Sequence, residues 1–352
     1  MSIPLTPPEQ TTVVVPAPAS GEGNWSGAAS AAVLDGRYWL TWRERRPLHA
    51  GRGVAAHVAV SSDGVNFETE GSVTVDDFPD DLRPASLERP ALVRLADGRL
   101  RLYLSCATRD SKHWWIEART AATARELAST ADRLVVLPGS DEVGVKDPVI
   151  WHDGTGWLML VTCHPLDIPD AEDRMTTRLY TSADGLGWSD RGDVLAGRPG
   201  AWDEHGARAT AVLPPMTQDA GRGAGPDARA GAGHGADAGD PAGAGTADGT
   251  ETLDVATESG VGAMPPYLLY DGRPDAESNW EETTGLARWD GRRYASVPFE
   301  SGMRAGAGGQ TWPVRHVSVV AEPGGGLRFY AEAPRPDGAH DLVSWTAGQV
   351  AG

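Results

Sequence analysis

The sequence predicts an all-β protein, a single five-bladed β-propeller with four-stranded antiparallel blades. Two observations support this fold class. The 352 residues include 44 Gly and 26 Pro, which separate many short apolar runs and are typical of strands joined by turns. In addition, a pattern of paired apolar runs recurs about every 60 residues, as in proteins built from repeated β-sheets.

Each repeat begins with a predicted β-hairpin, in which a Gly-containing turn joins two apolar runs. The first three hairpins lie at 28–45, 88–109 and 146–165, and their turns are typical hairpin signals. A third strand, a Ser-x-Asp-Gly turn and a short fourth strand follow at 55–71 and 176–192. Four strands repeated radially form a propeller blade.

Two weaker copies complete the expected ring. The fourth hairpin pairs 208–215 with 266–273, and the fifth lies at 315–334. The Gly/Ala/Asp-rich segment 217–258 has too few apolar residues to form a core, so it predicts a disordered insertion in the fourth blade. TTVVVP, at 11–16, is expected to join the last blade and close residues 1–352 into one domain.

Charge and composition exclude several classes of protein. With 49 Asp and Glu against 31 Lys and Arg, the net charge is −18, which argues against a nucleic-acid or membrane partner. No run of 18 apolar residues predicts a membrane span, and the first 20 residues lack the basic start of a secretory signal. Cys106 and Cys163 each end an apolar run and are expected to be reduced, buried thiols. These features favour a cytoplasmic protein.

The repeat predicts where a functional site lies. Starts of first strands and ends of second strands are expected to meet on one face, at the central channel. Polar residues and one tryptophan gather at these positions. They are Trp25, Arg43, Glu88, Arg89, Arg109, Lys146, Asp147, His164, Arg208, Asp271, Arg315 and His316.

The motif KDPVIW at 146–151 and the blade layout resemble the five-bladed propeller glycosidases, such as arabinanases, invertases and levansucrases. The layout is most similar to glycoside hydrolase family 130, the mannoside phosphorylases and mannosidases. In that family the third blade carries a Lys-Asp motif followed by His-Arg-Pro, similar to 146–147 and 164–165 here. The family's Glu-Asp-Pro-Arg and Leu-x-Tyr-His-Gly motifs resemble 88–91 and 269–272.

The resemblance implies a catalytic carboxylate at Asp147, with Glu88 and Glu204 as candidates for a second. The sequence departs from these enzymes at the acid positions, which Arg89 and Arg208 occupy, and the start of the first blade has no carboxylate. Hydrolysis normally needs two carboxylates. A phosphorylase can instead combine one acid with a cationic phosphate site. The candidates for that site are Arg89, Lys146, His164, Arg208 and Arg315.

Two classes of function therefore remain. The first is a glycoside hydrolase or glycoside phosphorylase acting on a carbohydrate at the channel. The second is a catalytically degenerate propeller that binds carbohydrate or serves another reaction in secondary metabolism. The arginines favour a bound anion such as phosphate, although Glu88, Asp147 and Glu204 could neutralise them in a structural network.

No cofactor is expected, and no metal is demanded, because no His/Asp triplet has the spacing of metal ligands. A channel cation held by carboxylates and water is compatible with the sequence. Trp25 is expected either to stack on a sugar ring or to pack between blades.

Overall fold

The computed structural model describes residues 10–171, 173–214, 264–298, 311–323 and 325–347, and these belong to one unit of the chain. The expected insertion at 217–258 lies outside the described residues. Within them, all regular elements are β-strands and short 3-10 helices, so the predicted all-β class is confirmed. No helix in the described ranges is long and apolar enough to cross a membrane.

Three separate antiparallel sheets of four strands each follow the predicted repeat. The first comprises β6 (Ser86–Arg94), β7 (Leu100–Ala107), β8 (Trp114–Ala121) and β9 (Arg133–Leu137). The second comprises β10 (Val143–His152), β11 (Trp157–Pro165), β12 (Thr176–Ser182) and β13 (Ser189–Ala196). The third comprises β14 (Arg208–Val212), β15 (Tyr267–Gly272), β16 (Thr283–Trp289) and β17 (Tyr294–Val297).

The remaining strands form one eight-stranded mixed sheet, where two separate blades were expected. It contains β2 (Trp25–Leu34), β3 (Arg37–Arg45), β4 (Gly53–Ser61), β5 (Glu68–Thr74), β18 (Arg315–Ala321), β19 (Leu327–Pro334) and β20 (His340–Ala347), with β1 (Thr12–Val15) on β20. The sheet is continuous because Trp25 of β2 pairs in parallel with His340 of β20. The pairing of β1 with β20 confirms that the early TTVVVP segment joins the last strands.

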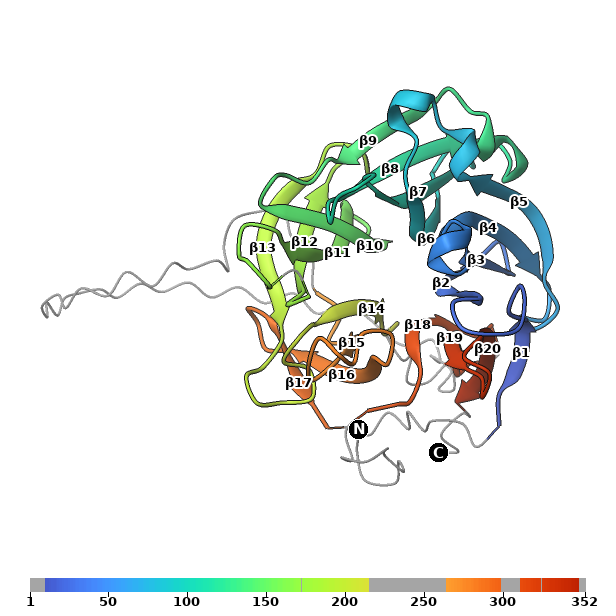
Figure 1. The fold of residues 1–352 in the computed structure, drawn as a ribbon. Helices are drawn as coiled ribbons and strands as arrows, with labels where there is room; N and C mark the ends of the chain where they lie inside the picture. Colours follow the sequence, from blue (N-terminus) through green and yellow to red (C-terminus); the bar gives the residue numbers. More distant parts are fainter. Residues whose placement is uncertain (1–9, 172, 215–263, 299–310, 324, 348–352) are drawn as a thin grey trace, which may run out of the picture. The chain divides into compact units, whose positions relative to one another are not determined.

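Short 3-10 helices occupy some of the connections. They are η1 (Leu48–Ala50), η2 (Val75–Asp77), η3 (Asp80–Leu82) and η4 (Arg125–Ala128). Within the described unit, β2, β6, β10, β14 and β18 lie toward the middle of the ring of strands (Figure 1). Apolar side chains fill the spaces between neighbouring sheets, for example where Leu160 of β11 and Leu268 of β15 share one core cluster.

All five inner strands carry a β-bulge near their start. The pairing register shifts between Gly27 and Ser30, Leu87 and Pro90, Lys146 and Val149, Ala209 and Ala211, and Arg315 and Ser318. A bulge bends its strand and re-aims the local side chain. In three of the bulges a non-glycine residue adopts a positive φ, namely +53° at Ala28, +57° at Asp147 and +51° at His316.

The bulges are held in place by side chains from other hairpins, in another sheet or elsewhere in the eight-stranded sheet. A backbone N–H in each bulge donates to an oxygen across the interface. The pairs are Ala28 to Glu332 at 3.1 Å, Arg89 to Asp147 at 3.3 Å, Asp147 to Ser105 at 2.9 Å, Ala209 to Thr177 at 2.9 Å and His316 to Asp271 at 2.8 Å. A buried N–H without a partner is costly, so these bonds fix the inner strands relative to one another.

We predict that Thr177→Val destabilises the protein. The Thr177 hydroxyl accepts from Ala209 N and donates to the Ala207 carbonyl at 2.6 Å, fully buried. Valine keeps the shape but leaves both backbone groups unpaired, which costs about 1–3 kcal/mol. Urea denaturation measures the effect, and Thr177→Ser, which keeps the hydroxyl, should lose less. Equal stability of Thr177→Val and wild type would contradict the role of this bond.

Candidate functional site

A cavity of about 950 Å³ opens over the inner strands, and charged side chains line most of it. Nine of the thirteen predicted site residues line this cavity. They are Trp25, Arg43, Glu88, Lys146, Asp147, His164, Arg208, Arg315 and His316. These nine residues come from β2, β3, β6, β10, β11, β14 and β18, and the rest of the lining comes from β3, from β8 and from connections between second and third strands. The repeat therefore brings most of the predicted residues together.

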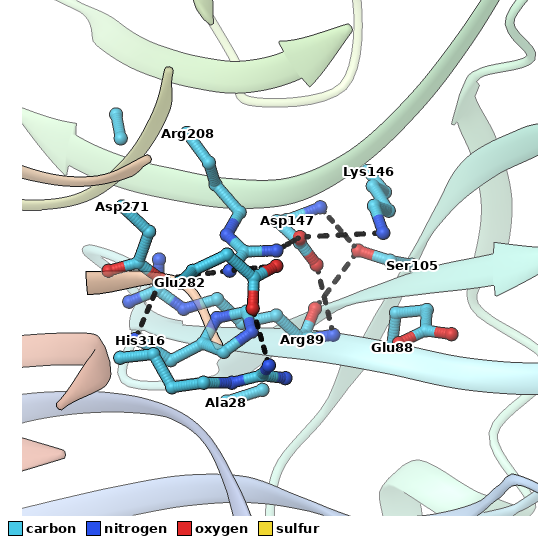
Figure 2. A network of polar contacts seen from close by, with 12 residues as sticks. Ala28, Glu88, Arg89, Ser105, Lys146, Asp147, Arg208, Asp271, Glu282 and His316 are labelled. Atoms are coloured by element: carbon cyan, nitrogen blue, oxygen red, sulfur yellow. Dashed lines mark hydrogen bonds and ion pairs between the residues drawn. The ribbon is translucent and has the colours of Figure 1, made fainter. Parts of the chain in front are cut away.

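Arg89 and Asp271 are buried directly beside these lining residues. The Arg89 guanidinium donates to the carbonyls of Ala29, at 3.0 Å, and Thr210, at 2.6 Å. Asp271 accepts from the Thr284 hydroxyl at 2.7 Å, from His316 N at 2.8 Å and from Arg208 at 2.9 Å. Both side chains thus brace the inner strands, and Figure 2 shows Asp271 beside Arg208 and His316.

Glu204 and Arg109 do not line the cavity. The Glu204 carboxylate accepts from Gly200 N at 2.8 Å and lies 3.6 Å from Arg174, partly exposed. The exposed Arg109 side chain donates to the carbonyl of Arg83 at 3.4 Å. The structure therefore gives neither residue a contact with the other predicted site residues.

Asp147 has the most unusual carboxylate in the cavity. It is 2 % exposed, adopts its positive φ directly before a proline, and accepts from Arg89 N with Oδ1. Its Oδ2 has no hydrogen-bond partner within the described residues. That oxygen lies 3.8 Å from Arg208 Nη1 and 4.0 Å from Lys146 Nζ (Figure 2). A buried polar atom with unused bonding capacity is a candidate for contact with a ligand.

Glu88, by contrast, is held by arginines. It forms ion pairs with Arg43 and with Arg52, the latter at 2.9 Å. Burial raises the pKa of Glu88, but the charges of Arg52 and Arg43 outweigh burial and bring that pKa well below its usual range. Glu88 is therefore ionised near neutral pH, and its carboxylate is held in ion pairs with Arg43 and Arg52.

Glu282 is a third buried carboxylate that lines the cavity, and it was not predicted. It lies 2.5 Å from Arg315, 3.3 Å from Arg208 and 3.6 Å from Arg273. Burial raises its pKa, but the three arginines lower it more, to about 2. Glu282 lies in the connection before β16, outside the repeated hairpins, so the repeat carries no signal for it.

Glu332 was also missed, although the repeat does contain a signal for it. It lies opposite Arg315 in the β18–β19 pair, as Asp271 lies opposite Arg208 in the β14–β15 pair. Its carboxylate pairs with Arg315 at 2.8 Å and with His340 at 2.8 Å. Glu332 thus occupies in the fifth hairpin the position that Asp271 occupies in the fourth, and the register of the repeat marks it.

Among the buried side chains around the cavity, positive charges outnumber negative charges. Seven buried cationic side chains gather there, Arg43, Arg45, Arg89, Lys146, Arg208, Arg273 and Arg315, against five buried carboxylates, Glu88, Asp147, Asp271, Glu282 and Glu332. Several buried donor atoms among them have no hydrogen-bond partner within the described residues, including Arg43 Nη2, Arg89 Nη1 and Arg208 Nε. Unpaired donors and excess positive charge together suit an oxyanion.

His316 sits inside this positive field. Burial lowers its pKa well below the usual value, and the charges of Arg208 and Arg315 lower it further. The imidazole is therefore neutral near pH 7. No group of three or more His, Cys, Asp or Glu in the described ranges could hold a metal ion.

We predict that Glu282→Gln strongly destabilises the protein. Removing this charge leaves three buried arginines without their shared counter-ion, which typically costs about 3–5 kcal/mol. Asp190→Asn is a matched control, because Asp190 pairs with Arg178 at 3.0 Å in a solvent-exposed position, where a pair contributes at most about 1 kcal/mol. Equal losses in chemical denaturation would contradict the prediction.

The free energy of unfolding is also expected to fall in acid, in one step due to His316 and a second step due to Glu282. The unfolded chain protonates His316 near its ordinary pKa of 6.5 while the folded chain resists protonation, so stability falls below that pH. Glu282, with a folded pKa of about 2 against 4.5, adds a loss as pH falls from 4.5 toward 2. Asp271 acts in the opposite direction, because burial raises its pKa above 3.8.

Melting temperatures between about pH 7.5 and pH 2 test both steps of this expectation. His316→Asn should reduce the loss that occurs just below pH 6.5, since asparagine does not titrate and tolerates a positive φ. A melting temperature that stays constant or rises on acidification would contradict it.

Solved structures similar to this chain are glycoside hydrolases and a family of mannoside phosphorylases. A thermostable family-43 glycoside hydrolase has a TM-score of 0.58 at 11% identity, covering 96% of this chain and 92% of the other. An exo-1,5-α-L-arabinanase from a bovine ruminal metagenomic library has a TM-score of 0.54 at 14% identity, with coverages of 97% and 96%.

A third similar structure comes from glycoside hydrolase family 130. This family of mannoside phosphorylases contains glycoside hydrolases that target β-1,2 mannosidic linkages in Candida mannan. The TM-score of this third structure is 0.51 at 14% identity, and 97% of this chain and 90% of that one are covered. No protein-family model and no curated protein sequence matches the chain. The expected resemblance to the propeller glycosidases, including the family 130 layout, is thus confirmed as a shared fold.

Proposed function

We propose that this chain is a five-bladed β-propeller that acts on a glycoside in the charged cavity, with Asp147 as its central carboxylate and phosphate as its second ligand. The eight-stranded sheet supplies the first and fifth blades in this proposal. β2–β5 form one antiparallel set of four strands, and β18–β20 with β1 form the other. One parallel residue pair joins the two sets.

The observation that carries the proposal is the free Oδ2 of Asp147. Arginines form ion pairs with Glu88 and Glu282, whereas this oxygen is buried, has no hydrogen bond from any described residue, and faces Arg208 and Lys146. An acid that gives a proton to a leaving oxygen must reach that oxygen directly. Of these three carboxylates, Asp147 is the one with an oxygen available for that contact.

The excess of positive charge favours phosphorolysis over hydrolysis. In phosphorolysis a phosphate oxygen attacks the anomeric carbon, the bond from that carbon to the glycosidic oxygen breaks, and an acid protonates the leaving oxygen. One carboxyl group and a cationic phosphate site suffice for this reaction. Hydrolysis needs a second carboxylate to activate water, and the arginines that hold Glu88 and Glu282 compete with that role.

A second candidate function is carbohydrate binding without catalysis, or a different reaction on the same scaffold. The ion-paired state of Glu88 and Glu282 favours it, because each carboxylate then serves as a counter-ion for buried arginines. A cytoplasmic location remains a prediction from the sequence under either function.

A measurement of turnover distinguishes a glycoside phosphorylase from a protein that binds carbohydrate without catalysis. The protein is incubated with β-1,2-mannobiose or 1,5-α-L-arabinobiose, with and without inorganic phosphate, and sugar phosphate is followed by phosphorus NMR. Wild type should form sugar phosphate, and Asp147→Asn should be slower by about 100-fold or more. Asparagine still accepts from Arg89 N and tolerates a positive φ, so the fold should persist.

Asp190→Asn, on the solvent-exposed ion pair, is the control and should react as wild type does. Full activity in Asp147→Asn would place the chemistry elsewhere. Binding of either disaccharide without any turnover would favour the second candidate.

A further inference from the structure

A second hollow of about 470 Å³ adjoins the charged cavity. The two share five lining residues, Trp25, Asn279, Trp280, Glu282 and Arg315. A ligand that fills the charged cavity can therefore extend into this hollow, past Trp280. Together they have room for more than one sugar ring, since ligand pockets typically span roughly 300–1,000 Å³.

Trp280 is held in an unusual way between the two spaces. Its side chain is 36 % exposed, while its backbone adopts a φ of +83°. L-amino acids with bulky side chains rarely adopt this conformation, and glycine adopts it readily. An exposed tryptophan in a strained backbone contributes little to the core, and such strain often marks a functional position.

Trp25, the aromatic residue predicted from the sequence, has less exposed surface with which to contact a sugar. Its ring is 2 % exposed and stacks on His340 with ring centres 4.4 Å apart. The Arg45 guanidinium lies 3.8 Å from the centre of the same ring. Trp280 packs edge to face against Trp25, with ring centres 5.7 Å apart, so the buried Trp25 helps to hold the position of Trp280.

The chemistry of the hollow differs from that of the charged cavity. Its other lining residues include the acidic Glu22 and Glu281 and the apolar Pro313 and Val314. The two exposed carboxylates disfavour an anion and can accept hydrogen bonds from hydroxyl groups. An aromatic ring with acceptors beside it suits an uncharged sugar ring, which presents C–H groups on its face and hydroxyls at its edge.

We propose that Trp280 is the aromatic platform of a second sugar subsite, which binds an uncharged sugar ring of the glycoside whose reacting end lies in the charged cavity. This inference rests on the proposed function, since it assigns the subsite to the same substrate. Trp280 then determines which glycosides bind, and it takes no part in bond breaking.

Trp280→Gly is a sharp test, because it removes the ring and suits the φ of +83°. Its melting temperature should equal or exceed that of wild type. Its affinity for β-1,2-mannobiose or 1,5-α-L-arabinobiose, measured by calorimetry, should fall about tenfold or more, while Trp280→Phe should retain most of it. Leu134→Ala, at an exposed apolar side chain outside both cavities, should bind as wild type does.

Unchanged disaccharide affinity in Trp280→Gly, or no affinity of the wild type for either disaccharide, would overturn the inference. A parallel titration with inorganic phosphate tests the proposed function separately. If phosphate binds and Trp280→Gly retains its affinity for the disaccharides, the inference fails and the proposed function stands. If the disaccharides need Trp280 but phosphate does not bind, the inference stands and the phosphate site of the proposed function fails.

Discussion

The concentration of positive charge at the centre of an acidic protein is the constraint on which the rest of the structure depends. The chain carries a net charge of −18, yet buried cations outnumber buried carboxylates around the cavity. Like charges repel strongly where water is excluded. Each carboxylate in this region therefore serves as a counter-ion, and Glu282 alone lies within 4 Å of three arginines.

The same carboxylates also hold the inner strands together. Asp271 accepts the N–H of a bulge in another sheet, and Glu332 accepts the N–H of the β2 bulge within its own eight-stranded sheet. Both also pair with an arginine, so fold and charge balance depend on the same carboxylates. Asp147 follows this pattern with Oδ1, which accepts from Arg89 N. Its Oδ2 remains without a hydrogen bond in the described structure, and this difference singles out Asp147.

Sequence repetition predicted the parts of the fold and site that recur in every blade. Hairpins, inner-strand starts and the central placement of Asp147 and Arg208 follow from the register of the repeat. Glu282 and Trp280 could not be predicted in this way, because they lie in the connection between β15 and β16, and the connections between second and third strands differ in length and sequence from one hairpin to the next. The single eight-stranded sheet also escaped prediction, because it depends on one backbone pairing between Trp25 and His340.

Phosphate titration followed by thermal unfolding tests the central claim, an oxyanion site among these cations, most directly. Wild type should gain saturable stability, up to about 2.7 kcal/mol when phosphate reaches 100 times its dissociation constant. Lys146→Gln, which removes a cation that lies 4.0 Å from Asp147, should lose most of the gain. Arg99→Gln, on the surface ion pair with Asp97, should keep it. No stabilisation of wild type by millimolar phosphate, or equal stabilisation of Lys146→Gln, would contradict the account.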